Sequence, residues 1–212
     1  MNTMLSRWLK QHIFWLLLII VCLLAETLGL ADSLRFDRGL IDQGHLWLLL
    51  SGHFVHLNAQ HLWLNQAGLV LVMVFFSRYC SVLIWSQVII ISALFVALGL
   101  YWLNEDIIWY VGLSGVLHGL FIVGAWYEMK QFFNSGLVLL LLVIAKLTWE
   151  QVYGPMPGSE SMTGGHVAVD AHFYGALGGV LFLLLHKVVH INNGHQDRQY
   201  NEQNNNAHEN NQ

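Results

Sequence analysis

Residues 112–119, Gly-Leu-Ser-Gly-Val-Leu-His-Gly, lie just inside an apolar segment that covers residues 111–127. A segment of this length and composition predicts a helix buried in a membrane. Ser114 stands between Gly112 and Gly115, where the lack of side chains lets another chain approach closely. A serine in this setting, just below a membrane surface, is a candidate nucleophile.

The composition of the whole chain is typical of a membrane protein. Hydrophobic residues make up 56% of the 212 residues and charged residues only 10%, whereas soluble domains have roughly 45–50% and about 25%. A net charge of −4 gives no basic footprint, so nucleic acid is not expected as a partner. We predict an all-α membrane protein, a bundle of six transmembrane helices in the lipid bilayer, from apolar stretches at about 13–30, 57–77, 80–103, 111–127, 135–152 and 168–190.

The distribution of Lys and Arg predicts how these helices are oriented. If the N-terminus is cytoplasmic, Arg35 and Arg38 lie outside, and six positive residues lie inside: Arg7, Lys10, Arg78, Lys130, Lys187 and Arg198. The excess favours cytoplasmic N- and C-termini. We expect a cytoplasmic N-terminus at 1–12, a six-helix domain at 13–190 and a disordered, Asn-rich cytoplasmic tail at 191–212. The first segment also resembles a cleavable signal peptide, and this alternative stays open.

Three separate segments are expected to bring reactive side chains to one depth. Ser114 lies near the outer end of the fourth predicted helix, about 5 Å below its start at 1.5 Å per residue. His172 has the same depth in the sixth helix, and His61 and Asn65 share one face of the second, because they are four residues apart. Polar side chains inside a bilayer usually face the bundle interior. These four side chains are therefore expected to meet.

The residue types in this group suit acyl transfer. A serine hydroxyl needs a base to accept its proton and donors that stabilise the oxyanion formed on attack. His172 is the candidate base. The Ser114 amide, near a helix N-terminus, and the side chains of His61 and Asn65 are the candidate oxyanion donors.

Two pairs of glycines predict close packing of the fourth helix on the sixth: Gly115 with Gly119, and Gly175 with Gly179. Each feature taken alone more often has a structural role. Small residues usually serve helix packing, and an intramembrane serine or histidine usually bonds to a nearby helix. Their coincidence at one depth favours a catalytic site.

Three other polar residues or pairs allow more than one interpretation. Lys146 and Glu150, four residues apart, form either a mutual pair near the outer surface or a charged gate for a substrate. His118, one turn after the serine, either stacks on His172 or competes with it as base, and a base on a separate helix is favoured. Asp170 lies about 200° round the helix from His172, so it is expected to cap the sixth helix.

A metal site is an alternative for the histidines at 53, 56 and 61. Their spacings of three and five do not place all three on one narrow helix face, and no thiolate accompanies them. No metal or cofactor is therefore expected. The loop 153–167 contains both prolines and leads into the sixth helix, so it is interpreted as a movable cap.

At these residues the chain resembles the rhomboid family of intramembrane serine proteases. The resemblance rests on Phe54-Val55-His56-x4-His61-Leu62-x2-Asn65, Gly112-Leu113-Ser114-Gly115-x3-Gly119 and Ala171-His172-x2-Gly175-x3-Gly179. It implies a catalytic dyad of Ser114 and His172 and lateral substrate entry near the second and fifth helices. It also implies an oxyanion hole from His61, Asn65 and the Ser114 amide. We add His118 and Gly112 as candidate residues of the oxyanion and substrate-binding site. The Trp-Arg pair often found in the family's first outer loop is Trp47-Leu48 here, so an arginine anchor for that loop is not expected.

A narrower resemblance is to rhombosortase, a bacterial subfamily. It is carried by Trp109-Tyr110-Val111-Gly112-Leu113-Ser114-Gly115, by Lys146-Leu147-x-Trp149-Glu150-Gln151 with Gly154-Pro155-x-Pro157-Gly158-Ser159, and by Val169-Asp170-Ala171-His172-x-Tyr174-Gly175-Ala176. It implies membrane-anchored, exported substrates that end in a Gly-Gly motif, a hydrophobic helix and a basic cluster. It also implies the bacterial inner membrane, with the active site facing the periplasm.

The competing interpretations are a rhomboid protease with other membrane substrates, an inactive rhomboid-like protein that binds helices, and a small metal or solute carrier. An inactive relative should lack the serine or the histidine, and this chain keeps both.

Overall fold

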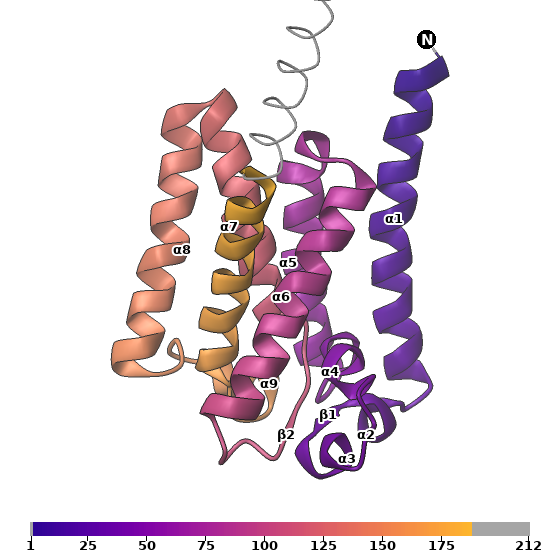
Figure 1. Cartoon of the computed structure of the whole chain (residues 1–212), viewed down its shortest axis with the longest axis vertical. Coiled ribbons are helices and arrows are strands. Elements are labelled where there is room, and N and C mark those ends of the chain that lie inside the picture. The colour runs from indigo at the N-terminus through magenta and orange to yellow at the C-terminus, as the bar shows by residue number, and fades with distance from the viewer. Residues whose placement is uncertain (1, 188–212) are drawn as a thin grey trace, which may run out of the picture.

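The computed structural model describes residues 2–187 and is mostly helical. Figure 1 shows its long helices side by side, with the start of α1 at the top and most of the short elements at the bottom. Within the described residues the long helices are α1 (Asn2–Thr27), α5 (Ala59–Phe76), α6 (Val82–Leu103), α7 (Ser114–Gln131), α8 (Phe133–Tyr153) and an unlabelled final helix (Val169–Lys187).

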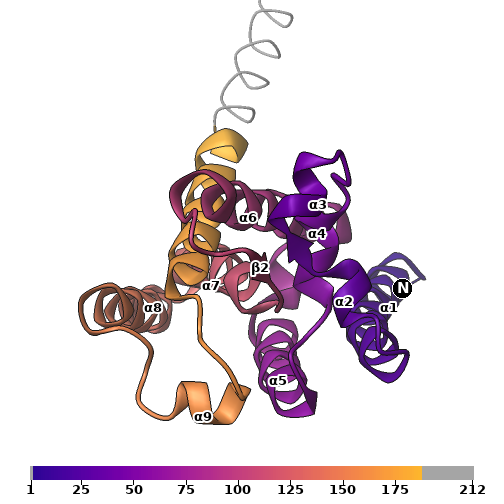
Figure 2. The same cartoon turned by 90° about the horizontal axis from the view of Figure 1, so that it is seen from below.

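Five of these helices are long and apolar enough to cross a membrane, and α7 is not among them. α7 carries Glu128 and Lys130 and several glycines, which lower its mean hydropathy. It lies at the centre of the bundle (Figure 2), against α5, α6 and α8. Such a helix has little contact with lipid and needs less apolar surface. A count of six spans stays a prediction.

The core of the bundle surrounds α7. Val116, Leu120 and Val123 of α7 are fully buried and pack with side chains of neighbouring helices, such as Leu69 and Val88. By contrast, α1 and α8 keep many large apolar side chains exposed, as lipid-facing helices require. These include Leu17 and Leu24 of α1 and Leu142 and Val152 of α8.

A region of short elements separates α1 from α5. We call it the outer region, and it comprises α2 (Ala31–Leu34), β1 (Phe36–Asp37), α3 (Arg38–Asp42), α4 (Leu48–Ser51) and the 3-10 helix η1 (Gly52–Phe54). Strand β1 pairs antiparallel with β2 (Trp109–Tyr110), with Phe36 opposite Tyr110. The pairing joins the outer region to the chain that leads into α7. The remaining short elements are η2 (Ser77–Tyr79) and α9 (Ser159–Thr163).

Arg38 fastens the outer region to the end of α6. Its guanidinium donates to the carbonyl oxygens of Tyr101 at 2.6 Å, Leu100 at 2.8 Å and Asn104 at 2.9 Å. Carbonyls at a helix C-terminus lack helical partners, and a cation there is also favoured by the helix dipole. An arginine therefore does fasten the outer region. The anchor comes from a different position, while Leu48 is buried in the core.

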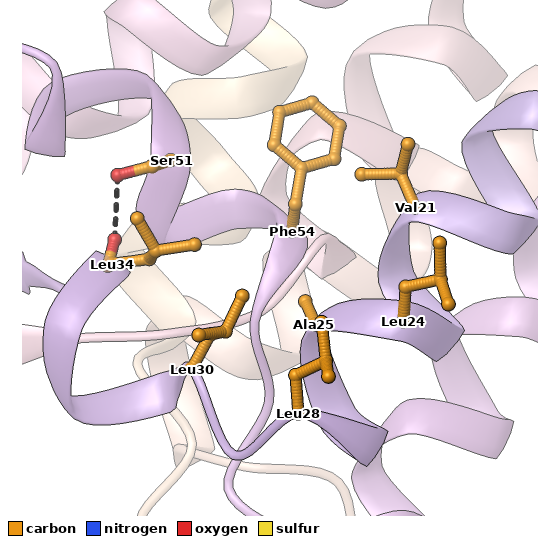
Figure 3. A pocket seen from close by; sticks show the side chains of 8 residues that line it. All are labelled: Val21, Leu24, Ala25, Leu28, Leu30, Leu34, Ser51 and Phe54. Atoms are coloured by element: carbon orange, nitrogen blue, oxygen red, sulfur yellow. Dashed lines mark hydrogen bonds between the residues drawn. The ribbon is translucent and has the colours of Figure 1, made fainter.

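An apolar cavity of about 310 Å³ lies between the end of α1 and the outer region (Figure 3). Ser51 is the polar member of its wall, and its hydroxyl donates to the Leu34 carbonyl at 2.7 Å. The cavity therefore offers apolar surface, and none of its wall residues is a candidate site residue. The wall consists of Val21, Leu24, Ala25, Leu28, Leu30, Leu34, Ser51 and Phe54.

Helix boundaries differ from the apolar stretches of the sequence. α1 already begins at Asn2, because helical hydrogen bonding continues into polar residues beyond the apolar run. α7 begins at Ser114 rather than at 111, since the preceding residues form strand β2 and a turn. The expected tail at 191–212 lies outside the described residues.

Candidate active site

Ser114 is the first residue of α7, and a glycine turn places it there. Gly112 has a φ of 119°, which glycine adopts far more readily than other residues. Its N–H donates to the Gly52 carbonyl at 3.0 Å, and its carbonyl accepts from the Tyr110 hydroxyl at 2.9 Å. The outer region and β2 thus fix the turn. The expected start of this helix at about residue 111 is wrong, because α7 begins at Ser114. The serine amide instead belongs to the first turn, where amides lack helical partners.

His172 faces Ser114 from the first turn of the final helix. Its Nε2 lies 2.9 Å from Ser114 Oγ. Its other ring nitrogen, Nδ1, lies 2.9 Å from the carboxylate of Glu150. Because a carboxylate only accepts, Nδ1 carries the proton and Nε2 accepts from the serine hydroxyl. His172 is buried, whereas Ser114 is partly exposed.

Close packing of α7 on the final helix makes this contact possible. A Cβ atom at Gly175 would lie 1.8 Å from the Gly115 carbonyl oxygen, and one at Gly179 would lie 2.6 Å from the Gly119 carbonyl oxygen. Real Cβ atoms almost never come within 3.0 Å of a heavy atom in a residue that is not their neighbour in the chain. The two predicted glycine faces therefore meet, backbone against backbone.

His61 and Asn65 of α5 lie against the glycine turn. A Cβ atom at Gly112 would lie 2.7 Å from His61 Cε1 and 3.7 Å from Asn65 Nδ2. The Leu57 N–H points at His61 Nδ1 at 3.5 Å, which leaves the ring proton on Nε2. Asn65 Nδ2 donates one hydrogen to the His61 carbonyl at 3.2 Å and has a second to offer. Both side chains thus have a donor available near the turn.

His118 stacks on His172, with ring centroids 4.4 Å apart and an angle of 24° between the planes. Its Nδ1 lies 2.7 Å from the Ser114 carbonyl oxygen, and its Nε2 lies 3.1 Å from Lys146 Nζ. Both nitrogens are therefore engaged away from the serine hydroxyl.

The two acidic residues near His172 differ from their expected roles. Lys146 and Glu150 do form a pair, at 2.6 Å, but the Glu150 carboxylate is buried and its second oxygen bonds His172. Asp170 does not stand at the N-cap, because the final helix begins at Val169. Its carboxylate instead accepts from two side-chain amides: that of Asn104, directly after α6, at 2.6 Å, and that of Gln151 on α8, at 3.2 Å.

A model of the rhomboid domain matches residues 43–187. The match covers more than half of the chain and includes every candidate site residue. The chain belongs to the rhomboid family. This rhomboid is therefore a multi-pass membrane protein of a family of intramembrane serine proteases. A comparison with curated proteins found no match.

His53 and His56 of this rhomboid are buried next to the site. His53 Nε2 lies 3.0 Å from the Ala93 carbonyl oxygen, and the His56 ring meets the His61 ring edge-on at 5.1 Å. Burial lowers the pKa of His53 to about 4. Burial, with a smaller effect of nearby His61, lowers the pKa of His56 to about 3. Both rings are therefore neutral at pH 7.

One group of possible metal ligands lies close together among the described side chains. It consists of His118, Glu150 and His172, whose ligand atoms are all within 4.8 Å of one another. The Lys146 ammonium already bonds two of these three residues, so a metal ion would have to displace it. The group thus fits a hydrogen-bond network built around a lysine cation.

The loop after α8 is fastened over the start of α5. Asn58 caps α5 by accepting from the His61 N–H at 2.9 Å, and its Nδ2 donates to the Thr163 carbonyl at 2.8 Å. A larger cavity of about 1420 Å³ lies between α7, α8 and the final helix, with Thr148 and Gln151 in its wall. This cavity lies on the side of α8 that faces the final helix. The entry implied by the resemblance lies on the other side, towards α5.

Three residues of this rhomboid were not given these roles from the sequence: Glu150, Arg38 and Asn58. For Glu150 a signal exists, since an acidic residue inside a predicted span needs a partner. For Asn58 the signal is its place at the start of an apolar stretch, because Asn is favoured at an N-cap. No local signal predicts that Arg38 bonds the end of a helix more than sixty residues later.

Proposed function

We propose that this rhomboid is an active intramembrane serine endopeptidase, with Ser114 as nucleophile and His172 as general base. The observation that carries the proposal is the 2.9 Å contact between Ser114 Oγ and His172 Nε2, which joins two helices far apart in the chain. A serine and a histidine that only packed the bundle would not need their reactive atoms in contact at a partly exposed position.

The reaction follows from the proton positions. Ser114 Oγ attacks the substrate carbonyl carbon while His172 Nε2 accepts the hydroxyl proton. The oxyanion that forms is stabilised by the Ser114 amide, by His61 Nε2–H and by the second hydrogen of Asn65 Nδ2. His172 then gives the proton to the leaving amine, and the acyl group stays on Ser114 Oγ. In the second half, His172 accepts a proton from water, which attacks the acyl carbon, and the proton then returns to Ser114 Oγ.

We further propose the membrane orientation and the extent of the protease. The outer region, with Arg35 and Arg38, lies at the end of the bundle where α7 starts (Figure 1). The other end has the turn between α5 and α6 with Arg78, the last turn of α7 with Lys130, and the end of the final helix at Lys187. This distribution supports cytoplasmic N- and C-termini, with the site facing the periplasm of a bacterial inner membrane. The protease domain is proposed to span 13–190.

The proposed substrates are exported proteins with a C-terminal tail of the rhombosortase type. A peptide bond at the end of a helix must unwind before a serine can attack it, and glycine lowers helix stability by about 1 kcal/mol relative to alanine. A Gly-Gly pair therefore eases unwinding, and it adds no side chain to clash in the site. A basic cluster after the substrate helix would stay in the cytoplasm and hold the glycines at the outer surface.

The test uses purified protein and a periplasmic reporter with such a tail. A fluorophosphonate probe should label Ser114, and the reporter should be cut at or near the glycines by the wild type but not by Ser114→Ala. Equal cutting by Ser114→Ala would reject the protease. Equal cutting of a tail with Leu-Leu in place of Gly-Gly would reject the sorting substrates and leave a rhomboid protease with other membrane substrates.

A further inference from the structure

Glu150 lies in the last turn of α8 and is enclosed by protein. Its side chain is only 2% exposed, compared with 38% for its partner Lys146. An ionised carboxylate away from water is costly unless charges and hydrogen bonds compensate it. Here each oxygen has a partner: Oε1 accepts from Lys146 Nζ at 2.6 Å, and Oε2 accepts from His172 Nδ1 at 2.9 Å.

We propose that Glu150 is a positioning residue that completes a triad with Ser114 and His172, and that Lys146 holds one carboxylate oxygen so that the other faces the imidazole. The proposal rests on the proposed protease function and deepens it. Glu150 acts through His172 and does not touch the substrate.

The proton positions around Glu150 support this role. A carboxylate only accepts and an ammonium only donates. Glu150 therefore receives the Nδ1 proton of His172, which leaves a lone pair on Nε2 for the Ser114 hydroxyl. Lys146 donates to His118 Nε2, so His118 carries its proton on Nδ1 and donates it to the Ser114 carbonyl. The hydrogen bonds thus form a closed series that runs from the Ser114 hydroxyl through the four neighbouring side chains to the Ser114 carbonyl. Each of these bonds joins a donor to an acceptor.

The other nearby carboxylate does not compete for this role. Both oxygens of Asp170 accept from side-chain amides, those of Asn104 and Gln151. The imidazole of His172 is instead held on one side by Glu150 and on one face by the stacked ring of His118. The hydrogen bond to Glu150 fixes the tautomer, and the stacked ring of His118 holds the plane of the imidazole, as a general base requires.

Glu150→Gln is the decisive variant, because an amide has one oxygen and one NH₂ group. The Lys146 ammonium attracts the amide oxygen, and the NH₂ group then faces His172 Nδ1. The histidine must accept there, so its proton moves to Nε2 and points at Ser114 Oγ. We expect kcat to fall by about 10²- to 10⁴-fold while KM changes by less than about threefold. The rate of fluorophosphonate labelling at Ser114 should fall with kcat.

The double variant Lys146→Met/Glu150→Gln gives a result that a structural role does not predict. Without the ammonium, the amide can turn its oxygen to His172 and restore the working tautomer. We expect kcat at least about tenfold above that of Glu150→Gln, because part of the general-base contribution returns. If Glu150 only stabilised the fold, loss of a second polar partner would lower activity further.

Glu128→Gln is the matched control. Glu128 is also a buried carboxylate with several partners, Arg78, Tyr79 and Ser135, but it lies at the opposite end of α7. Its loss should affect stability and leave kcat per folded molecule unchanged. Glu150→Asp should keep the tautomer and lose less activity than Glu150→Gln.

All rates are measured on folded protein isolated by size-exclusion chromatography. If Ser114→Ala and His172→Ala still cut the reporter, the proposed function fails. If those two variants are inactive but Glu150→Gln keeps kcat within threefold, or the double variant shows no recovery, the triad is overturned and the dyad remains. If Glu150→Gln yields no folded protein, Glu150→Asp and the double variant are measured in its place. The triad predicts that both of these variants are active, and an inactive folded variant would overturn it.

Discussion

Replacing Gly175 by alanine would push the final helix away from α7 at the point that positions the base. The new Cβ atom would lie 1.8 Å from the Gly115 carbonyl oxygen, although such atoms almost never come within 3.0 Å. The atoms that the new Cβ would meet belong to the backbone of Gly115, so no flexible side chain can move aside. The two helices must therefore part by about 1.2 Å or more, the difference between these two distances.

This separation is large compared with the tolerance of the catalytic contact. Ser114 and His172 lie one and three residues from the glycine contact, and their reactive atoms are 2.9 Å apart. Parting the helices would lengthen this distance to about 4 Å, beyond the range of a hydrogen bond. General-base catalysis contributes about 10²- to 10⁴-fold, and most of it should be lost. Overpacking of this kind also costs about 1–3 kcal/mol of stability.

The assay compares fluorophosphonate labelling and reporter cleavage per folded molecule, with thermal unfolding in detergent as the measure of stability. Gly68→Ala on α5 is the matched control, because its Cβ atom would meet only the end of the Leu117 side chain, at 2.7 Å. That variant should stay close to the wild type. Labelling of Gly175→Ala within about threefold of the wild type would refute the reasoning, since general-base catalysis would then survive the separation.

Two further predictions concern the outer region. Burial lowers the pKa of His53 to about 4 and of His56 to about 3. Their contribution to stability is therefore complete above about pH 6.5, where both imidazoles are neutral in the folded and in the unfolded protein. This stability is lost as pH falls towards 4, by about 2 kcal/mol per histidine at pH 5. The melting temperature of His56→Phe should therefore depend less on pH than that of the wild type. An equal pH dependence of the two melting temperatures would contradict the prediction. Arg38→Gln should lower stability by about 2–3 kcal/mol, because hydrogen bonds from a charged group are lost. Arg35 instead forms partly exposed ion pairs with Asp32 and Asp37, so Arg35→Gln should change stability by less than about 1 kcal/mol. Equal melting temperatures for the two variants would reject the anchoring role of Arg38.

Much of the bundle was predictable, because a membrane restricts what a sequence can do. Each span needs about 20 apolar residues, so the long helices appear directly as apolar stretches. Polar side chains in those stretches must face protein rather than lipid. For this reason Ser114, His172, His61 and Asn65 could be grouped from residue type and depth, and the structure places them around one turn.

The outer region was not predicted, since its short helices have mixed composition and no clear period. Its place depends on contacts distant in the chain, such as the hydrogen bonds from Arg38 to the end of α6 and the pairing of β1 with β2. These contacts satisfy backbone groups that no neighbouring residue could satisfy. They also set the turn at Gly112, which decides that α7 begins at the serine.

The sequence by itself determined that the chain is a helical membrane protein, and it supplied a serine and a histidine suited to acyl transfer. It also indicated that Lys146 and Glu150 are neighbours, because a spacing of four places two side chains on one helix face. Only the tertiary structure decided that the second oxygen of Glu150 bonds His172 and that Asp170 does not. Spacing fixes directions within one helix, whereas the partner across two helices depends on how they pack.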